Sequence, residues 1–512
     1  MLRTSYLNKT KGLIYLSDKS IKRKQLTKTL KPHWVWAIAL GSSIGWGCFV
    51  LPTTWMGQAG PIGVIMGLAI GAALMMLIAV SYGFLIKHFP VSGGEFAYTF
   101  ISLGRVHAFI CGWFLTLGYI CIVALNASAF TLMLKFILPE VIQNVKLYTI
   151  AGWDVYLTEI MIATLILGLF AFFNIKGTGI SGRLQFVFCT ILVLGVLALT
   201  GISLADPVAS IQNINPGFKP GITTFSAIIA IVAVAPWAYV GFDNVPQAAE
   251  EFHFSSKKAF SLIILALLFA AILYSLMILT TAVAFPWQET VNANYMWGTG
   301  TVVFELLGTT GMLILVASLS MGVFTGLNGF YISSSRVLFA MSRAKVLPDG
   351  FSKLHSKFKT PYVGVIFTAI IAAIAPWFGR EVLLWIVDMS SIGVSIAYFY
   401  TTYTAYKLFT WSENGNSQPL HDVKPVVAPM KKAFAVVGMM SSIVFILLLL
   451  VPGSPAFMGI PSLIALGVWV ILGLLFFVIR KQEFMNLTQN ELVYLILGKK
   501  SISLKDEPNQ IQ

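Results

Sequence analysis

The sequence predicts an all-α integral membrane protein of twelve transmembrane helices, in which the first and sixth helices are discontinuous. Of its 512 residues, 57% are hydrophobic and 11% are charged, and the mean hydropathy is +0.83. A soluble domain carries roughly 25% charged residues. Apolar segments of the roughly 20 residues that a membrane span needs recur along the whole chain. Two of these segments contain residues that interrupt a helix.

Twelve segments have the length and composition of a membrane span. In chain order they cover residues 34–58, 62–86, 107–135, 155–175, 182–204, 224–247, 258–285, 302–340, 362–379, 382–407, 433–452 and 460–480. The eighth segment is longer than one span requires. We therefore expect one of its ends to lie outside the hydrocarbon, or the helix to tilt strongly.

The first segment is weakened in its middle by the run GSSIGWG, residues 41–47, which is followed by Pro52. Irregular backbone at membrane depth is tolerated only where it is buried in protein or lines a water-filled cavity. Glycine also serves helix packing, as Gly63, Gly67 and Gly71 indicate in the second segment by recurring every fourth residue. Packing is therefore the alternative interpretation of residues 41–47.

The sixth segment contains a second weak point, APWAYVGFD, at residues 235–243. Interrupted segments in corresponding positions of two halves indicate the binding site of a secondary transporter. We therefore expect a transporter that works by alternating access, with its site between the two breaks.

The chemistry of such breaks suits a zwitterion. Backbone N–H groups at the start of a resumed helix attract a carboxylate, and we expect them at Ser43, Ile44 and Gly45, with a hydroxyl from Ser42 or Ser43. Carbonyl groups at residues 235–237 would hold an ammonium group. The candidate substrate-binding residues are Ser42, Ser43, Ile44, Gly45, Trp46, Gly47, Ala235, Pro236, Trp237, Val240 and Gly241.

The formal charge of +14 is a topology signal. If the N-terminus is cytoplasmic, 30 of the 34 Lys and Arg residues lie on the cytoplasmic side, and the exceptions are Lys135, Lys146, Lys219 and Arg380. This bias predicts a multi-pass protein of the cell membrane with both termini in the cytoplasm. We expect the lipid bilayer, and no nucleic acid, as its macromolecular environment. The first 33 residues, with nine basic side chains, form the expected cytoplasmic tail.

Cysteine and histidine usage predicts neither a metal site nor an enzyme. The four cysteines lie inside apolar segments without a CxxC pair. The six histidines are scattered near the predicted cytoplasmic ends, whereas a membrane-embedded enzyme would need clustered acids, His or Cys near the membrane centre. We therefore expect no catalytic residue, no metal ligand and no cofactor.

Several motifs resemble the amino acid–polyamine–organocation family of secondary transporters, of the amino acid permease type. They are PVSGGEFAY (90–98), GSSIGWG (41–47), PWAYVGFDNVPQAAEE (236–251), SRVLFAMSRAKVLP (335–348) and, more loosely, WIVDMSSIGV (385–394). The resemblance extends over roughly residues 34–407.

The resemblance implies a five-plus-five inverted repeat. The first repeat would be 34–204 and the second 205–407, followed by two additional spans in 408–480. Residues 1–33 and 481–512 would be cytoplasmic tails.

The resemblance also implies roles for single residues. Trp237 occupies the position of an aromatic gate, and Val240 would border the substrate side chain. The resemblance favours a gating role for Glu95, and capping of a short helix is the alternative. Apart from the resemblance, Tyr119 or Tyr239 is a candidate neighbour of the substrate side chain.

Two acids follow the sixth segment and would set an inner gate. We expect Glu250 and Glu251 to pair with Lys257 and Lys258 or with another basic loop. Glu159, near the end of a span, is expected to be solvated.

Asp243 lies near the middle of the membrane, where an ionised side chain is costly. Three interpretations stay open: pairing with backbone amides that the break leaves exposed, a proton or pH response, and direct contact with the substrate.

The coupling mechanism and the substrate are open at this point. Some relatives carry a lysine in the middle of the fifth span, but residues 183–199 have Leu192 or an apolar neighbour there and no lysine. Proton coupling, sodium coupling through Ser320 and Thr325, and substrate exchange are all possible, and the oligomeric state is not predicted. An amine, polyamine or amino alcohol is an alternative to an amino acid. A channel and a non-transporting sensor are alternatives from other classes.

Overall fold

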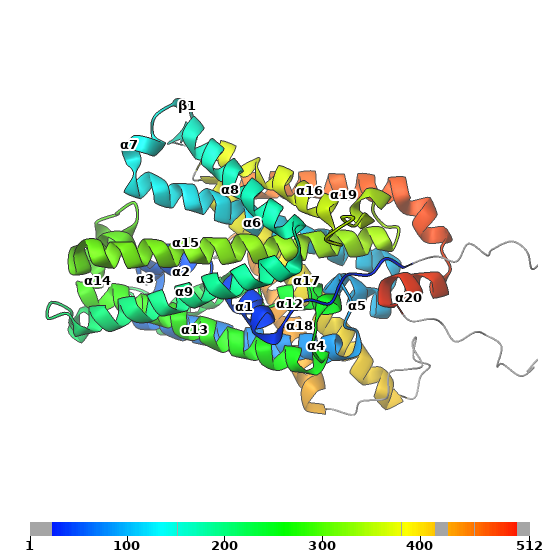
Figure 1. Cartoon of the computed structure of the whole chain (residues 1–512). Coiled ribbons are helices and arrows are strands. Elements are labelled where there is room, and N and C mark those ends of the chain that lie inside the picture. Colours follow the sequence, from blue (N-terminus) through cyan, green and yellow to red (C-terminus); the bar gives the residue numbers. More distant parts are fainter. Residues whose placement is uncertain (1–22, 151, 380, 415–428, 455, 499–512) are drawn as a thin grey trace, which may run out of the picture.

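The computed structural model describes residues 23–150, 152–379, 381–414, 429–454 and 456–498. It is a bundle of long helices that run between two ends of the molecule (Figure 1). The expected cytoplasmic tails fall largely on residues 1–22 and 499–512, outside the described part.

Eight helices of the described part are long and apolar enough to cross a membrane. They are α4 (Pro61–His88), α6 (Arg105–Ile137), α8 (Leu157–Ile175), α9 (Thr178–Ala205), α13 (Ala259–Ala284, with the turn from Ser256), α15 (Gly298–Arg343), α18 (Pro429–Leu450) and α19 (Ile460–Asn486). Within α15, which contains the long eighth segment, Gly308 leaves helical geometry with φ 61°.

The other four predicted spans take different forms. The first consists of α1 (Pro32–Ser43), α2 (Gly47–Val50) and α3 (Pro52–Ala59), and the sixth of α10 (Thr224–Val232), α11 (Ala235–Ala238) and α12 (Asn244–Gln247). The ninth is short, with α16 (Tyr362–Ala372) and the 3₁₀ turn Ala375–Phe378, and the tenth lies in α17 (Glu381–Asn414). Twelve crossings therefore stay a prediction.

Short elements connect the long helices. They are α5 (Gly94–Leu103), α7 (Pro139–Ile142), α14 (Trp287–Asn292), α20 (Gln489–Leu497) and 3₁₀ turns at Ile211–Ile214, Ala249–Glu251, Ser256–Lys258 and Asp349–Ser352. An antiparallel hairpin, β1 (Lys146–Ile150) with β2 (Trp153–Tyr156), departs from the all-α prediction. It lies at one end of the bundle, beside α7 (Figure 1).

Close packing places the first and sixth spans against the long helices. The helices α6 and α15 pack on each other, and α4 packs on α13 and α10. A Cβ atom added to Gly67 would lie 2.5 Å from the Cβ of Ile231, and one on Gly71 would lie 2.6 Å from the Cβ of Ala235. The predicted packing stripe of the second span is thereby confirmed, because these glycines let α4 approach the sixth span.

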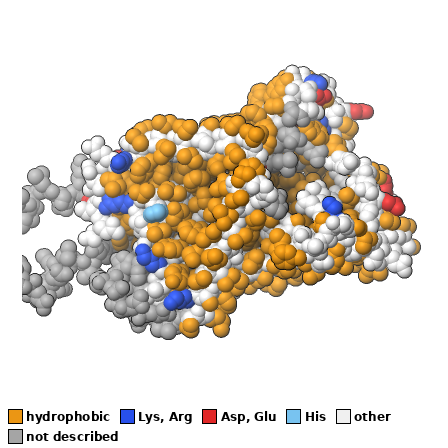
Figure 2. Space-filling model, turned by 180° about the vertical axis from the view of Figure 1, so that it is seen from behind, with side chains coloured by type: hydrophobic (Ala, Val, Ile, Leu, Met, Phe, Trp, Pro, Cys, Tyr) orange, Lys and Arg blue, Asp and Glu red, His pale blue; other side chains and the backbone are white. Residues whose placement is uncertain are grey.

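The surface is that of a multi-pass membrane protein. Figure 2 shows hydrophobic side chains covering most of the length of one face, with several Lys and Arg side chains toward one end. Leu165 is 73% exposed and Ile479 is 72% exposed. Large exposed apolar side chains of this kind are favourable in contact with lipid and unfavourable in contact with water.

The two ends of the described chain meet. Arg23 donates to the carbonyls of Leu495 (3.1 Å) and Ile496 (3.5 Å). Both chain ends therefore leave the bundle on one side, and the assignment of that side to the cytoplasm stays a prediction.

Candidate functional site

The first break leaves three backbone amides without a partner among the described residues. Helix α1 continues through Ser43, and the Ile44 N–H donates to the Leu40 carbonyl at 3.0 Å. The first amide that is bonded again is that of Cys48, which donates to the Gly45 carbonyl at 3.3 Å. The unpaired N–H groups are thus those of Gly45, Trp46 and Gly47.

This agrees with the expected unpaired amide at Gly45 and corrects the expectation for Ser43 and Ile44, which belong to the hydrogen-bonded end of α1. The two serines do not interrupt α1, which continues through Ser43, and the Ser43 hydroxyl donates to the Ala39 carbonyl of the same helix at 2.9 Å. Gly41 serves packing, since an added Cβ would lie 2.8 Å from Thr325. The packing alternative is therefore correct for Gly41, whereas the chain does leave the helix at residues 44–46.

The second break falls within the expected segment 235–243, but the carbonyls expected to be unpaired are bonded. The carbonyl of Ala235 accepts from the Tyr239 N–H (3.0 Å) and that of Trp237 from the Val240 N–H (3.4 Å), so neither is unpaired. Pro236 stands in the first turn of α11, where its missing N–H costs no hydrogen bond. Residues 233–234 and 239–243 lie outside the three helices of this span, and Gly241 has φ 131°.

The two breaks are in contact. The Ser43 hydroxyl lies 3.1 Å from the Tyr239 carbonyl oxygen, and the Tyr274 hydroxyl lies within 3.3 Å of the Ser43 carbonyl and 3.2 Å of the Ala238 carbonyl. A Cβ atom on Gly241 would lie 2.5 Å from the carbonyl carbon of Ser42. Glycine is therefore required there both by its φ and by the approach of the first span.

Trp237 covers the first break. Its ring lies against Gly47, where an added Cβ would be 2.5 Å from the ring edge. The ring centroids of Trp46 and Trp55 are 5.9 Å and 6.5 Å away, in edge-on arrangements. The indole is 9% exposed and packs directly on residues of the first break.

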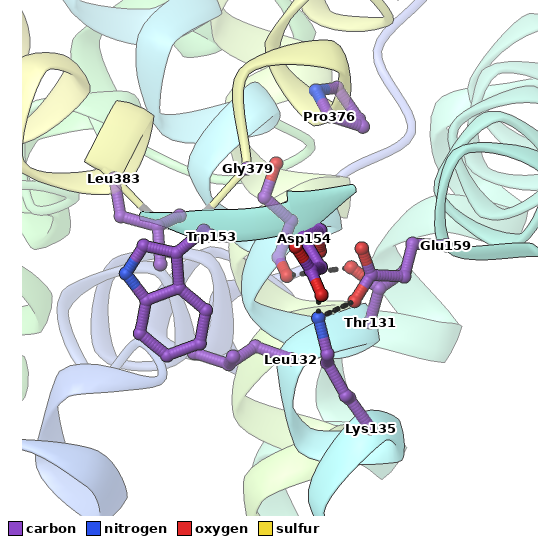
Figure 3. A pocket seen from close by; sticks show the side chains of 10 residues that line it. Thr131, Leu132, Lys135, Trp153, Asp154, Glu159, Pro376, Gly379 and Leu383 are labelled. Atoms are coloured by element: carbon purple, nitrogen blue, oxygen red, sulfur yellow. Dashed lines mark hydrogen bonds and ion pairs between the residues drawn. The ribbon is translucent and has the colours of Figure 1, made fainter. Parts of the chain in front are cut away.

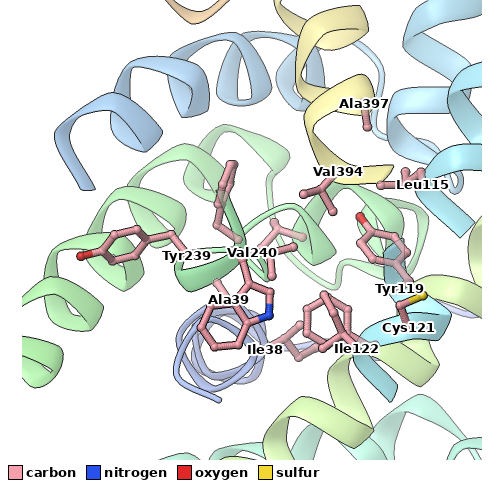
Figure 4. Packing of buried hydrophobic residues seen from close by; sticks show 14 of the residues in the cluster. Ile38, Ala39, Leu115, Tyr119, Cys121, Ile122, Tyr239, Val240, Val394 and Ala397 are labelled. Carbon is pink, nitrogen blue, oxygen red and sulfur yellow. The ribbon is translucent and has the colours of Figure 1, made fainter. Parts of the chain in front are cut away.

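Tyr119 and Tyr239 face opposite directions. Figure 4 shows Tyr239 turned away from the interior that Val240 and Tyr119 share. The Tyr239 hydroxyl donates to the Leu68 carbonyl in α4 at 2.8 Å. Of the two tyrosines named as neighbours of the substrate side chain, only Tyr119 lies on the Val240 side.

Further polar groups at the breaks lack partners, and the sequence interpretation missed two of them. Asn126 of α6 is 1% exposed, and its Oδ1 has no partner in the described structure, where it is the nearest atom to a Cβ added on Gly45, at 3.9 Å. The Asn244 amide and the Ser42 hydroxyl are likewise buried and unpaired within the described residues. Asparagine side chains inside apolar segments were the sequence signal that could have identified Asn126 and Asn244.

Asp243 is fully buried and well bonded. Its Oδ1 accepts from the Gly241 N–H at 2.7 Å and its Oδ2 from the Tyr119 hydroxyl at 2.9 Å. These contacts favour the structural interpretation, because the carboxylate holds the turn at Gly241. Glu95, which is also fully buried, contacts the Gln247 side-chain amide. Neither acid has a Lys or Arg partner among the ion pairs of the described residues.

At the end of the bundle where the chain ends meet, Glu250 and Glu251 bind arginines distant in sequence. Glu250 pairs with Arg23 (2.9 Å) and Arg343 (3.0 Å), and Glu251 pairs with Arg336 (2.8 Å). The expected pairing with Lys257 and Lys258 is wrong, because the segment before α1 and the end of α15 bring the arginines to these acids.

The environment of Glu250 keeps its carboxylate charged. Burial alone would raise the pKa of Glu250, but the charges of Arg343 and Arg23 outweigh it, and the pKa lies below its ordinary value. Its oxygens also accept from the N–H groups of Leu26 (3.3 Å) and Ser92 (3.2 Å).

A small pocket of about 30 Å³ lies near the hairpin (Figure 3). Lys135 extends into it and pairs with Glu159 at 2.8 Å, while its ammonium group lies 4.6 Å from the Tyr156 ring centroid. Glu159 is therefore paired and 9% exposed, which corrects its expected solvation. None of the residues of the two breaks lines this pocket.

Comparisons with known proteins identify the family. The family model described as amino acid permease matches residues 34–476. The branched-chain amino acid permease BcaP of Bacillus subtilis (strain 168) is 26% identical, over 69% of this chain and 75% of its own length. The methylthioribose transporter of the same organism is 28% identical, over 76% and 83%. Cationic amino acid transporter 4 of Mus musculus is 26% identical, over 77% and 61%.

The family match covers the segments that carry both breaks and most of the apolar helices. It confirms the resemblance inferred from the motifs, and it places the chain among transporters and not among enzymes. The chain belongs to the amino acid permease family.

Proposed function

We propose that the protein is a secondary active transporter that moves an amino acid across the cell membrane by alternating access, as an ion-coupled symporter or an exchanger. The observation that carries this proposal is the trio of unpaired amides at Gly45, Trp46 and Gly47, beside a second break. Amides at the start of a resumed helix suit a carboxylate. The carbonyls of Ala238 and Tyr239 would receive the ammonium group, once the hydroxyls of Tyr274 and Ser43 are displaced.

The surroundings of the amides support a small solute. Asn126 and Trp46 add unpaired polar atoms, and Trp237 packs directly on residues of the first break. Val240 and Tyr119 would border the side chain of the solute. The inverted repeat of 34–204 and 205–407 remains part of this proposal, because alternating access needs two halves that move relative to one another.

The coupling ion stays open. Gly322 lies between Leu192 of α9 and the Ile44 carbonyl of the first break. The side chain that α9 directs toward this part of the break is therefore the apolar Leu192, where some relatives carry a lysine. Thr325 and Ser320 donate to backbone carbonyls, at 2.8 Å and 2.7 Å, which favours a packing role for both hydroxyls.

The test is uptake by the full-length protein reconstituted in liposomes. Labelled amino acids of each side-chain class are offered with an imposed proton gradient, a sodium gradient or a trans-side substrate. We expect saturable uptake of at least one amino acid, with stimulation by one of the three conditions. Binding without uptake would indicate a sensor. Rapid flux without stimulation by trans-side substrate would indicate a channel.

A solute without a carboxylate is a second candidate, because a relative that is 28% identical is a methylthioribose transporter. The same liposomes separate the two candidates when each amino acid is compared with its decarboxylated amine. If the amides of residues 45–47 bind a carboxylate, the amine should compete at least about a hundredfold more weakly. Equal competition would favour the second candidate.

A further inference from the structure

A second cavity lies away from the two breaks, and the proposed transport cycle does not use it. It has a volume of about 500 Å³ and is bounded by the segment before α1, the junction of α8 and α9, and the loop 357–360. The segment before α1 runs past the start of α9 (Figure 1), and the hydroxyls of Thr29 and Thr178 are 2.8 Å apart.

The side chains around this cavity are strongly cationic. Lys176, Arg183, Lys357 and Lys359 line it, all are exposed, and none forms an ion pair in the described part of the chain. The acid in the lining is Glu251, whose two oxygens are bound by Arg336 at 2.8 Å and 3.3 Å. The cavity therefore has four positive charges without a neutralising partner.

Backbone donors face the same space. The N–H groups of Thr178 and Gly179 begin the 28-residue helix α9 and have no partner among the described residues. Cβ atoms added to Gly177 or Gly179 would meet no atom within 4 Å, so this backbone is open to a ligand. The start of a long helix attracts anions through its amides and its dipole.

The loop that carries two of the lysines is fixed in place. The His355 N–H donates to the Thr360 carbonyl at 2.8 Å, and the Thr360 hydroxyl donates to the Ile175 carbonyl at 2.6 Å, at the end of α8. Lys359 adopts φ 55°, a left-handed conformation that is unfavourable for a residue other than glycine. The loop thus holds Lys357 and Lys359 beside the α8–α9 junction.

Apolar side chains continue from the cavity along the surface of the helices. Ile180, which lines the cavity, is 43% exposed, and Val187, one turn beyond Arg183, is 45% exposed. Lys176 lies 4.5 Å from the ring centroid of Phe172, which is 49% exposed. A molecule with a charged group in the cavity could therefore lay acyl chains on this surface.

We propose that this cavity binds the phosphate group of an anionic phospholipid. Four unpaired cations and two unpaired amides recognise the phosphate, as basic pockets between membrane helices do, and the apolar flank favours a lipid over a soluble phosphate. Bound lipid would hold the segment before α1 against the start of α9 through Thr27 and Thr29, which belong to the lining.

The proposal is tested by thermal unfolding of the full-length protein in a neutral detergent, without transport substrate. Micelles containing phosphatidylglycerol, micelles containing phosphatidylcholine, and inorganic phosphate are titrated separately. We expect a saturable rise of the unfolding temperature with phosphatidylglycerol and none with phosphatidylcholine. The double variant Lys357→Gln/Lys359→Gln should bind phosphatidylglycerol at least about tenfold more weakly, since two of the four cations that line the cavity are removed.

Two matched variants serve as controls. Lys257→Gln/Lys258→Gln removes two exposed lysines that do not line the cavity and should leave binding unchanged. Lys357→Arg/Lys359→Arg should retain binding. Equal responses to both lipids, or an unchanged affinity in the glutamine double variant, would overturn the proposal. An equal response to inorganic phosphate would keep the anion site and reject the lipid as its source. Because no transport substrate is present, these outcomes do not depend on the proposed function.

Discussion

The two helix breaks differ in what they do with their polar backbone groups. In the first break, the amides of Gly45, Trp46 and Gly47 have no partner among the described residues. In the second, Asp243 binds the Gly241 amide, and hydroxyls of Ser43 and Tyr274 lie on the carbonyls of Tyr239 and Ala238. The amides of the first break are therefore free for the proposed substrate, whereas the carbonyls of the second become available only when the hydroxyls of Ser43 and Tyr274 move away. A helix interruption is therefore not by itself a binding site, and its hydrogen bonds must be counted.

The largest expected effect is that of Gly241→Ala, which tests whether the second break is structural. An alanine must adopt φ 131° and place its Cβ 2.5 Å from the Ser42 backbone. We expect a loss of more than about 3 kcal/mol of stability from backbone strain and overlap together. Unfolding of the purified protein measures the effect, with Gly201→Ala, at a helix position without neighbours within 4 Å, as the control. Normal stability of Gly241→Ala would contradict the close contact between the breaks.

Gly45→Val tests whether the first break binds substrate, and it should change affinity but not stability. The space beside Gly45 is open, so the larger side chain should be accommodated without loss of fold. It would lie beside the unpaired amides, and we expect substrate affinity to fall at least about a hundredfold. Equilibrium binding and thermal unfolding are measured on the same sample. Near-normal affinity would remove the first break from the substrate site.

Asp243→Asn distinguishes the interpretations of that residue. An asparagine cannot accept from both the Gly241 amide and the Tyr119 hydroxyl with its two side-chain atoms, because its nitrogen does not accept. We expect a loss of about 2 kcal/mol in stability and an unchanged pH profile of uptake. A profile that shifts or flattens in the variant would instead support the proton role.

Trp237→Ala should reduce transport about tenfold, because truncation uncovers the amides of the first break. Insertion and unfolding temperature should change much less than uptake. The control is Trp377→Ala, at a tryptophan that is 46% exposed and lies in the 3₁₀ turn Ala375–Phe378. Unchanged uptake kinetics in Trp237→Ala would argue against a gate at this position.

The smallest effect concerns the ion pairs of Glu250 with Arg23 and Arg343. The pKa of Glu250 is lowered in the folded protein. Its contribution to stability is therefore complete above the ordinary glutamate pKa of about 4.3 and is lost as the pH falls through the lower, folded value. Between pH 5 and pH 3, roughly, the unfolding temperature of the wild type should approach that of Glu250→Gln by about 2 °C. A constant difference across this range would contradict the assigned pairing.

Much of the fold could be predicted from local sequence. Apolar length predicted the membrane helices, and the glycine stripe of residues 63–71 predicted the close packing of α4. The family was identified from motifs alone, and the family match confirms it. The assignment of domains and the count of twelve spans stay predictions, because no measured membrane boundary accompanies the helices.

The site was predicted less well, for reasons that lie in tertiary contacts. Whether a glycine interrupts a helix depends on its neighbours: Gly41 is used by Thr325 for packing, while the chain leaves the helix only after Ser43. The partners of Glu250 come from Arg23 and Arg343, which are more than ninety residues away in the sequence. The local sequence pattern contains no information on contacts between residues that are so distant in the chain.

The position of Trp237 has a practical consequence for optical measurements. Its ring lies 5.9 Å and 6.5 Å from those of Trp46 and Trp55, close enough for their excited states to interact. A solute that displaces this ring would alter both the near-ultraviolet circular dichroism and the emission of the unlabelled protein. Occupancy of the space between the two spans could thus be followed in real time by light alone.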